Sequence, residues 1–249
     1  MEKGYQLFSA AALCQTAGGL RGTIEKIAKM GYDGVEFFDY AGTPSLELKR
    51  ILDGCGIKGL NVHVPLDRWQ QNLDAEIAYA LEAGIPMLTI PWLPPDKRIA
   101  EMYTLIVNNV PFWVEKCAKY GLQAGYHNHD FEYADFDGKN VLDTILQADD
   151  KLLLELDTFW AMYAGADPES EMEKYKDRMP LIHVKDYLDM RCDPPVFCAI
   201  GHGKMDESPI LEKAKALNLA WVVVEQDNST IDVLESARLS LQTLEELLP

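Results

Sequence analysis

Four acidic or histidine side chains stand at the ends of short apolar runs in this chain: Glu132, Asp157, His183 and Glu225. The runs beside them are typical of buried strands, and a buried charge is costly unless it is paired, so these positions predict a shared polar centre. Three carboxylates and one imidazole suit Mn²⁺, Mg²⁺ or Co²⁺ better than a thiolate-selected metal. Helix capping and core hydrogen bonds are the structural alternative for each residue taken alone. Together, the four predict a divalent-metal site.

The elements that must position these residues follow a repeating unit. An amphipathic helix ends at a glycine, which adopts positive φ without strain, and a strand rich in aliphatic or aromatic residues follows. The glycines are Gly31, Gly56, Gly84 and Gly121. The eight candidate strands are Tyr5–Phe8, Gly34–Phe38, Gly59–Val64, Met87–Ile90, Gln123–His127, Leu152–Leu156, Leu181–Val184 and Trp221–Val224.

Helical segments separate all eight candidate strands, and a last helix is expected at Thr230–Leu247. Strict alternation predicts a parallel sheet, and eight units predict a closed (β/α)₈ TIM barrel, an α/β fold that takes residues 1–249 as one domain. An open doubly wound sheet is the alternative. It would need a Gly-x-Gly-x-x-Gly loop after the first strand, and Ala17–Gly22 lacks that spacing.

In a barrel, the carboxyl ends of the strands open on one face, where the connecting loops build the site. The four candidate ligands fall on that side. The longest irregular stretch, Tyr187–Met205, is expected to form a rim or a lid over it.

The amino-acid composition indicates which kinds of binding partner and substrate the protein can have. A formal charge of -17 repels nucleic-acid phosphates and anionic membranes, so a small neutral substrate is favoured. Five cysteines without paired spacing indicate reduced thiols in the cytoplasm. No apolar run reaches the ~18 residues of a membrane-spanning helix. A homo-oligomer is compatible with exposed barrel helices, although no pattern identifies an interface.

Four stretches resemble the sugar isomerase/epimerase family of xylose isomerase-like TIM barrels, which includes inosose dehydratases and ketose 3-epimerases. They are Tyr126–Glu132, Leu156–Trp160, His183–Asp186 and Val224–Asp227. The resemblance implies that Glu132, Asp157, His183 and Glu225 bind one divalent metal. Mn²⁺ is the first choice, with Mg²⁺, Co²⁺ and Zn²⁺ as alternatives. It also implies that Glu132 and Glu225 act as catalytic acid and base.

The implied reaction is removal of a proton beside a carbonyl through a metal-stabilised enediolate. Return of the proton to the other face gives epimerisation, and return to the neighbouring carbon gives isomerisation. Loss of a β-substituent instead would make the protein a dehydratase or lyase of an inosose, a keto-sugar or a keto-glycoside. A non-catalytic sugar-binding or partner subunit is the alternative from another class.

Further side chains are candidates for substrate binding, each with a structural alternative of packing, hydrogen bonding or ion pairing: His63, Trp92, His129, Trp160 and Lys185. His127 and His129 share a strand face by the two-residue repeat, and His129 is favoured for function. Phe38 could stack on a sugar. Glu155 and Glu36 are expected to be buried partners for a cation.

Two departures from the family pattern bear on the substrate. Trp160 stands where the ketose 3-epimerases have a histidine, and Gly201-His202-Gly203 stands where relatives often have Gly-Glu-Gly, which leaves His202 with either a site or a loop role. No arginine cluster or glycine-rich nest marks a phosphate site, so the expected substrate is a neutral sugar or keto-sugar.

Overall fold

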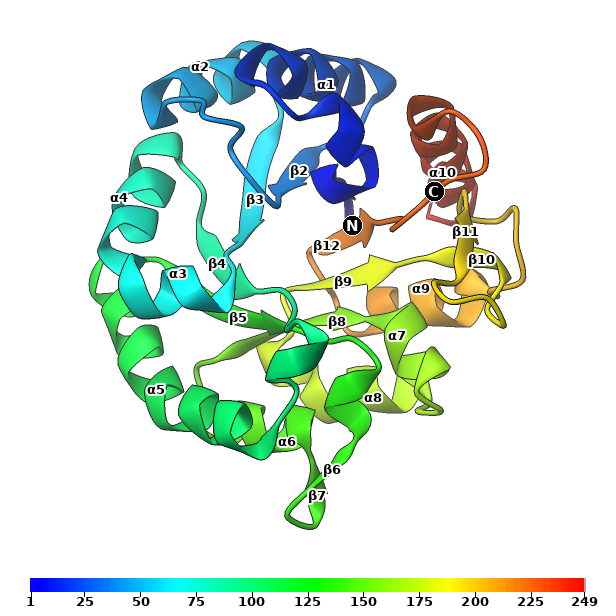
Figure 1. Ribbon diagram of the computed structural model, residues 1–249. Coiled ribbons are helices and arrows are strands. Elements are labelled where there is room, and N and C mark those ends of the chain that lie inside the picture. Colours follow the sequence, from blue (N-terminus) through cyan, green and yellow to red (C-terminus); the bar gives the residue numbers. More distant parts are fainter. Residues whose placement is uncertain (249) are drawn as a thin grey trace.

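The computed structural model describes residues 1–248 and shows a closed barrel of eight parallel strands (Figure 1). Neighbouring strands follow the order β1-β12-β9-β8-β5-β4-β3-β2 around the barrel. Their bounds are β1 Glu2–Gln6, β2 Gly34–Phe37, β3 Lys58–His63, β4 Met87–Ile90, β5 Gln123–His127, β8 Leu153–Asp157, β9 Leu181–Val184 and β12 Trp221–Val224. The predicted (β/α)₈ fold is therefore confirmed.

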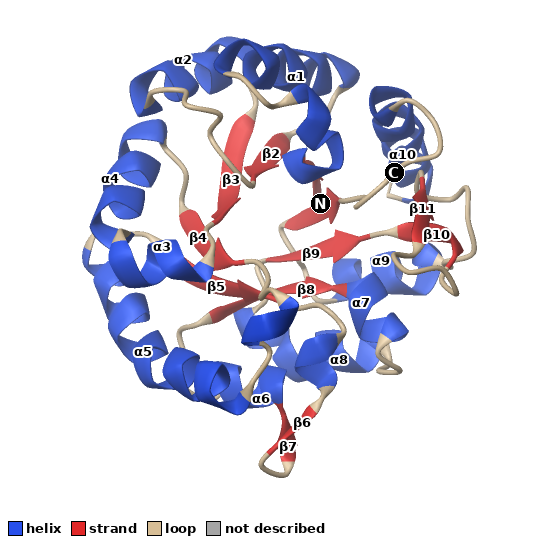
Figure 2. Ribbon diagram, viewed as in Figure 1, coloured by secondary structure: helices blue, strands red, loops and turns tan. Residues whose placement is uncertain are grey.

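Helices form a ring outside the strands, as the blue and red elements of Figure 2 show. The α-helices are α1 Ala17–Met30, α2 Ser45–Cys55, α3 Leu66–Gln71, α4 Leu73–Ala83, α5 Ala100–Lys119, α6 Val141–Leu146, α7 Thr158–Tyr163, α8 Pro168–Tyr175, α9 Glu207–Ala216 and α10 Val233–Leu247. Short 3₁₀ helices are η1 Leu7–Leu13, η2 Pro95–Lys97, η3 Phe131–Tyr133 and η4 Lys176–Arg178. Within residues 1–248, none of the helices is apolar over the length that crossing a membrane requires.

The predicted glycine stops are confirmed. Gly31, Gly56, Gly84 and Gly121 follow α1, α2, α4 and α5 with φ between 65° and 113°.

The amino-terminal end of α10 is capped by Asp232. Its side chain accepts hydrogen bonds from the backbone N–H groups of Leu234 and Glu235. This N-cap explains why the last helix starts at Val233 and not at the expected Thr230.

The barrel interior changes character along its axis. At the amino-terminal end it is closed by an apolar cluster of Leu60, Leu181 and Val223. Gly4 and Gly34 make room for Leu60, because a Cβ at either position would lie 2.7 Å from its side chain. Toward the carboxyl ends of the strands the inward side chains become polar and charged. The apolar end supports the fold, and the polar end faces the loops.

Two elements differ from expectation. The first strand ends at Gln6 and not at Phe8, because the Gln6 side chain accepts a hydrogen bond from the backbone N–H of Phe8 and starts η1. The long stretch after β9 is not wholly irregular, since β10 (Asp186–Asp189) pairs antiparallel with β11 (Val196–Cys198). A second small hairpin, β6 (Asp135–Phe136) with β7 (Lys139–Asn140), projects from the barrel near α6 (Figure 1).

Candidate metal centre and substrate pocket

Four side chains from neighbouring strands meet at the carboxyl end of the barrel: His127, Asp157, His183 and Glu225. One ligand atom from each lies within 4.8 Å of the others, and all four residues are buried. His127 and Asp157 are the last residues of β5 and β8, and Glu225 directly follows β12. Strand register brings them together, because Asp157 is paired with His183 across β8 and β9. We refer to these four residues as the metal-site cluster.

Two observations test whether these residues fit a metal ion. The first is spacing, because one donor atom from each of the four buried residues lies within 4.8 Å of the others, which a single ion can span. Asp157 Oδ2 and His183 Nε2 are buried beside charged neighbours, Lys185 Nζ at 3.1 Å and Glu155 Oε1 at 3.0 Å. Two imidazoles and two carboxylates also form a donor set that divalent transition metals accept. The cluster therefore fits a divalent ion.

The structure brings Asp157, His183 and Glu225 together as expected, but it places Glu132 elsewhere. Glu132 lies in η3, where its carboxyl accepts hydrogen bonds from the Tyr126 hydroxyl and the His129 backbone N–H, both at 2.8 Å. Burial raises the pKa of Glu132 to about 8. A second group of side chains close enough to share an ion is His63, His127, Glu155 and His183, and within residues 1–248 Glu132 belongs to neither group. His127 takes the fourth place.

The position of Glu132 has a simple physical reason. Glu132 follows the end of β5 by five residues and lies in η3, so the strand no longer sets the direction of its side chain. His127 is the last residue of the strand itself, and its side chain points inward with that of Glu155 on the paired strand. The signal in the sequence was the histidine that closes the apolar run Gln123–His127.

A layer of charged side chains lies beneath the cluster. The Glu155 Oε1 atom is 2.9 Å from His127 Nδ1, 3.0 Å from His183 Nε2 and 2.5 Å from His63 Nε2. Burial opposes the Glu155 charge, but the nearby histidines lower the pKa of Glu155 well below its usual range. Glu36 also lies 2.8 Å from His63 and accepts a hydrogen bond from Gln6. Glu155 and Glu36 are thus buried partners of cationic groups, as expected from the sequence.

His63 lies between these two carboxylates. Burial disfavours its charged form, but Glu155 and Glu36 outweigh that effect and raise the pKa of His63 to about 10. The imidazole ring also borders the pocket described below. The residue therefore combines the ion-pairing role with a position at the pocket floor.

Lys185 joins the metal-site cluster to Asp227. Its Nζ atom is 3.1 Å from Asp157 Oδ2, 3.0 Å from Glu225 Oε2 and 2.9 Å from Asp227 Oδ1. Burial alone would lower the pKa of this ammonium, but the three carboxylates raise the pKa of Lys185 well above its usual range. The ion pairs considered for Lys185 from the sequence are present, and they hold its charge beside the cluster.

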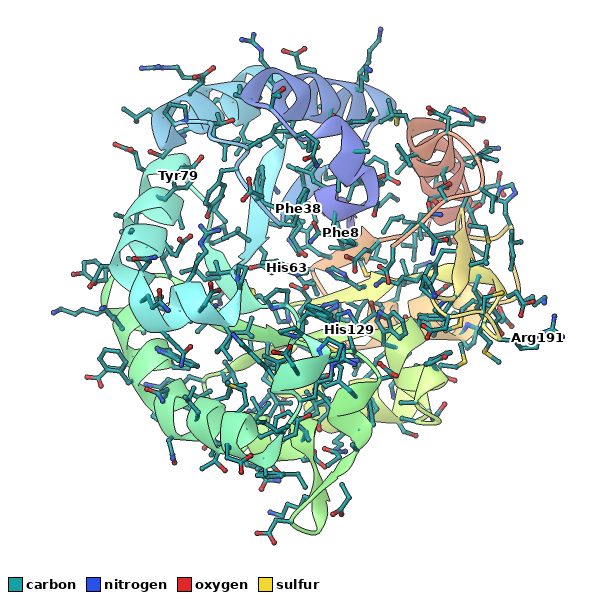
Figure 3. All side chains as sticks on the ribbon, viewed as in Figure 1. Phe8, Phe38, His63, Tyr79, His129 and Arg191 are labelled. Carbon is teal, nitrogen blue, oxygen red and sulfur yellow. The ribbon has the colours of Figure 1, made fainter. Side chains whose placement is uncertain are left out.

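A cavity of about 620 Å³ opens above the metal-site cluster. Among the residues expected to bind substrate, His63, Trp92, His129 and Trp160 line it, and so does Phe38. Figure 3 shows His63, His129, Phe8 and Phe38 across the centre of the barrel face. The loop residues Asp193, Pro194 and Pro195 also line the cavity, which agrees with the expected rim. His202 is exposed and is not among the lining residues.

Two ring nitrogens at this cavity have no hydrogen-bond partner within residues 1–248: His129 Nδ1 and Trp160 Nε1. The two rings stack with centroids 5.2 Å apart. Burial, together with neighbouring His127, holds the pKa of His129 well below its usual range, so the ring is neutral near pH 7. A neutral imidazole nitrogen can accept or donate a hydrogen bond, and the Trp160 Nε1–H can donate one, so each nitrogen suits a substrate hydroxyl.

Comparison with known proteins agrees with this architecture. One curated relative is an inosose dehydratase of Geobacillus kaustophilus (strain HTA426), 24% identical over 200 residues, a match that spans 71% of this chain and 64% of that protein's length. A sugar phosphate isomerase/epimerase structure from Parabacteroides distasonis ATCC 8503 superimposes with a TM-score of 0.77 at 23% identity and covers 100% of this chain and 94% of its own.

A third similar structure is the IolI protein with a bound zinc atom. It has a TM-score of 0.75 at 14% identity, and the alignment covers 100% of this chain and 98% of that one. At these identities the two structures show a shared fold. The model of one family, described as xylose isomerase-like TIM barrel, matches residues 24–247. The chain therefore belongs to the xylose isomerase-like TIM barrel family.

Proposed function

We propose that the protein is a divalent-metal-dependent sugar isomerase or epimerase that removes a proton beside the carbonyl of a keto-sugar. The observation that carries this proposal is the position of the metal-site cluster at the floor of a cavity large enough for a sugar. The similar proteins support a reaction of this class on a sugar or cyclitol, because one is an inosose dehydratase and another is named a sugar phosphate isomerase/epimerase.

A bound divalent ion would supply Lewis acidity, which stabilises the negative charge that develops on a carbonyl oxygen. The chain's own groups supply the rest. Glu225 borders the cavity, and its carboxylate can accept the proton from carbon. The Lys185 ammonium, 3.0 Å from Glu225 Oε2, stabilises negative charge nearby. His129 and Trp160 would orient substrate hydroxyls through their unpartnered nitrogens.

Elimination by a dehydratase or lyase is the second candidate, and the position of Glu132 favours it. Epimerisation by the two expected glutamates needs Glu132 across the substrate, and Glu132 is not among the residues that line the cavity, where the carboxylates besides Glu225 are Asp130, Asp193 and Asp227. Elimination needs one base on carbon and a proton donor for the leaving oxygen, so a single glutamate suffices for the first step.

The metal is also a proposal. Mn²⁺ was favoured by a set of three carboxylates and one histidine, whereas the cluster has two of each. Additional imidazole ligation shifts the preference toward Zn²⁺ and Co²⁺. The zinc atom in the IolI structure supports including Zn²⁺ in any test.

The experiment is hydrogen exchange in D₂O. Ketoses and keto-cyclitols are incubated with the protein and Mn²⁺, Co²⁺ or Zn²⁺, and products are followed by NMR and mass spectrometry. We expect deuterium to enter beside the carbonyl. An isomeric product supports the first candidate, and loss of water or an aglycone supports the second.

Glu225→Gln should slow this exchange by about 100-fold or more, the usual contribution of a general base. Glu76→Gln is the matched control, because Glu76 is a buried glutamate that pairs with Arg68 on the outer helices. Failure of every metal to support exchange would contradict the enzymatic proposal and favour a binding subunit.

A further inference from the structure

The cavity above the metal-site cluster has two unlike halves. Its inner half is buried and polar, with His63, His127 and Glu225 each at most 6% exposed. Its outer half carries aromatic rings that remain open to solvent: Phe8 is 43% exposed, Trp92 42% and Tyr163 37%. These rings come from η1, the segment after β4 and the end of α7. We call Phe8, Trp92 and Tyr163 the aromatic rim.

Exposed rings gathered around one cavity differ from single apolar residues scattered over a surface, because apolar groups clustered at a cavity and bordered by polar residues mark a binding site. Phe8 packs edge-on against Phe38, with ring centroids 5.5 Å apart, and Figure 3 shows the two side by side at the barrel mouth. Pro65, Pro91 and Pro195 add further apolar lining. The outer half is therefore built from stiff, flat groups that lose little entropy when they bind.

The size of the cavity exceeds what a monosaccharide requires. A hexose has about twelve non-hydrogen atoms, whereas cavities of ~300–1,000 Å³ enclose drug-sized ligands. A sugar held at the metal-site cluster is already next to Trp160, whose ring is 8% exposed and lies 5.4 Å from Lys185 Nζ. The aromatic rim is thus left for another part of the ligand.

The charges around the rim exclude an anionic group such as a phosphate. Asp130, Asp193 and Asp227 line the cavity, and Arg98 is its one lining arginine or lysine among the described residues. The Arg98 guanidinium is 3.9 Å from the centroid of Phe131, and its Nε donates a hydrogen bond to the Leu93 carbonyl. The carboxylates outnumber Arg98, so the lining disfavours an anionic outer group.

We propose that the aromatic rim binds a flat apolar substituent, best matched by an aryl ring, carried on the sugar that the inner half binds. This proposal rests on the proposed function for the inner half. The substrate is then a sugar conjugate and not a free monosaccharide. Stacking on Trp92 and contact with Phe8 provide the affinity for the substituent.

Binding of unreactive glycosides tests the rim without requiring turnover. Dissociation constants of phenyl β-D-glucopyranoside, methyl β-D-glucopyranoside and cellobiose are measured by calorimetry with the full-length protein and added Mn²⁺. We expect the phenyl glycoside to bind about tenfold more tightly than the methyl glycoside, equivalent to ~1.4 kcal/mol. Trp92→Ala should abolish this preference, and Trp92→Phe should retain most of it.

Phe112→Ala is the control, because Phe112 is an exposed aromatic residue on α5, 56% exposed, that does not line the cavity. Equal binding of the phenyl and methyl glycosides, no binding of either, or a preference that survives Trp92→Ala would overturn the proposal. Tighter binding of cellobiose would overturn it in favour of a second sugar ring. If free ketoses exchange deuterium but the phenyl glycoside is not preferred, the proposed reaction stands and the proposal for the aromatic rim fails. If the phenyl glycoside is preferred but no ketose exchanges deuterium, the proposal for the aromatic rim stands and the proposed reaction fails.

Discussion

Glu155 shows how one residue can organise a site that it does not enter. A single carboxylate oxygen lies within 3.0 Å of ring nitrogens of both histidines in the metal-site cluster. A hydrogen bond to one ring nitrogen sets the tautomer and orientation of the imidazole, and so presents the other nitrogen to a metal. The same oxygen contacts His63, which keeps this buried carboxylate paired.

Replacing this carboxylate with an amide is expected to weaken the metal site without removing a ligand. Glu155→Gln should lower the affinity for Mn²⁺ or Zn²⁺ by about 10- to 100-fold, the usual effect of losing such a partner. Calorimetric titration of metal-stripped protein measures this change. Glu76→Gln again serves as the control for loss of a buried glutamate. Unchanged affinity in Glu155→Gln would show that the histidines are held by packing alone.

At the scale of elements, the helix-terminating glycines matter because of their backbone conformation. Gly84 follows α4 with φ of +78°, and a Cβ there would have no neighbour within 4 Å. Gly22 lies inside α1, and a Cβ there would also have open space. An alanine at either site therefore meets no steric clash, so its effect on stability reports the backbone conformation at that site.

Alanine should act in opposite directions at these two glycines. Gly84→Ala is expected to lower the free energy of unfolding by about 1 kcal/mol, because L-residues are strained at positive φ. Gly22→Ala should raise it by a similar ~1 kcal/mol through higher helix propensity. Urea denaturation of both variants measures the difference. The same sign for both would contradict the assigned backbone conformations.

The alternation of helices and strands was enough to predict the barrel, because every strand but the first lies within two residues of its expected bounds. Three of the four residues of the metal-site cluster were predictable for the same reason, since each closes or follows a strand. The position of Glu132 outside the cluster was not, because it depends on how η3 turns after β5. The aromatic rim could be predicted only in part from the sequence. Its residues Phe8, Trp92 and Tyr163 come from three separate segments that only the closed barrel brings together.

At the scale of the whole molecule, the barrel concentrates charge at one end of its axis. Four carboxylates are buried there, in a chain whose formal net charge is -17: Glu36, Glu155, Asp157 and Glu225. Lys185 and the neighbouring histidines balance part of this charge. A divalent ion would balance more of it, so metal binding and folding stability should be coupled.

The most direct measurement is thermal unfolding of metal-stripped protein with Mn²⁺, Co²⁺ or Zn²⁺ added, run beside His127→Ala and Glu132→Gln. A metal at about 100 times its Kd stabilises by ~2.7 kcal/mol, or roughly 5–10 °C for a domain of this size. We expect this shift in the wild type and in Glu132→Gln, and none in His127→Ala. A shift that persists in His127→Ala and is lost in Glu132→Gln would contradict the metal centre described here.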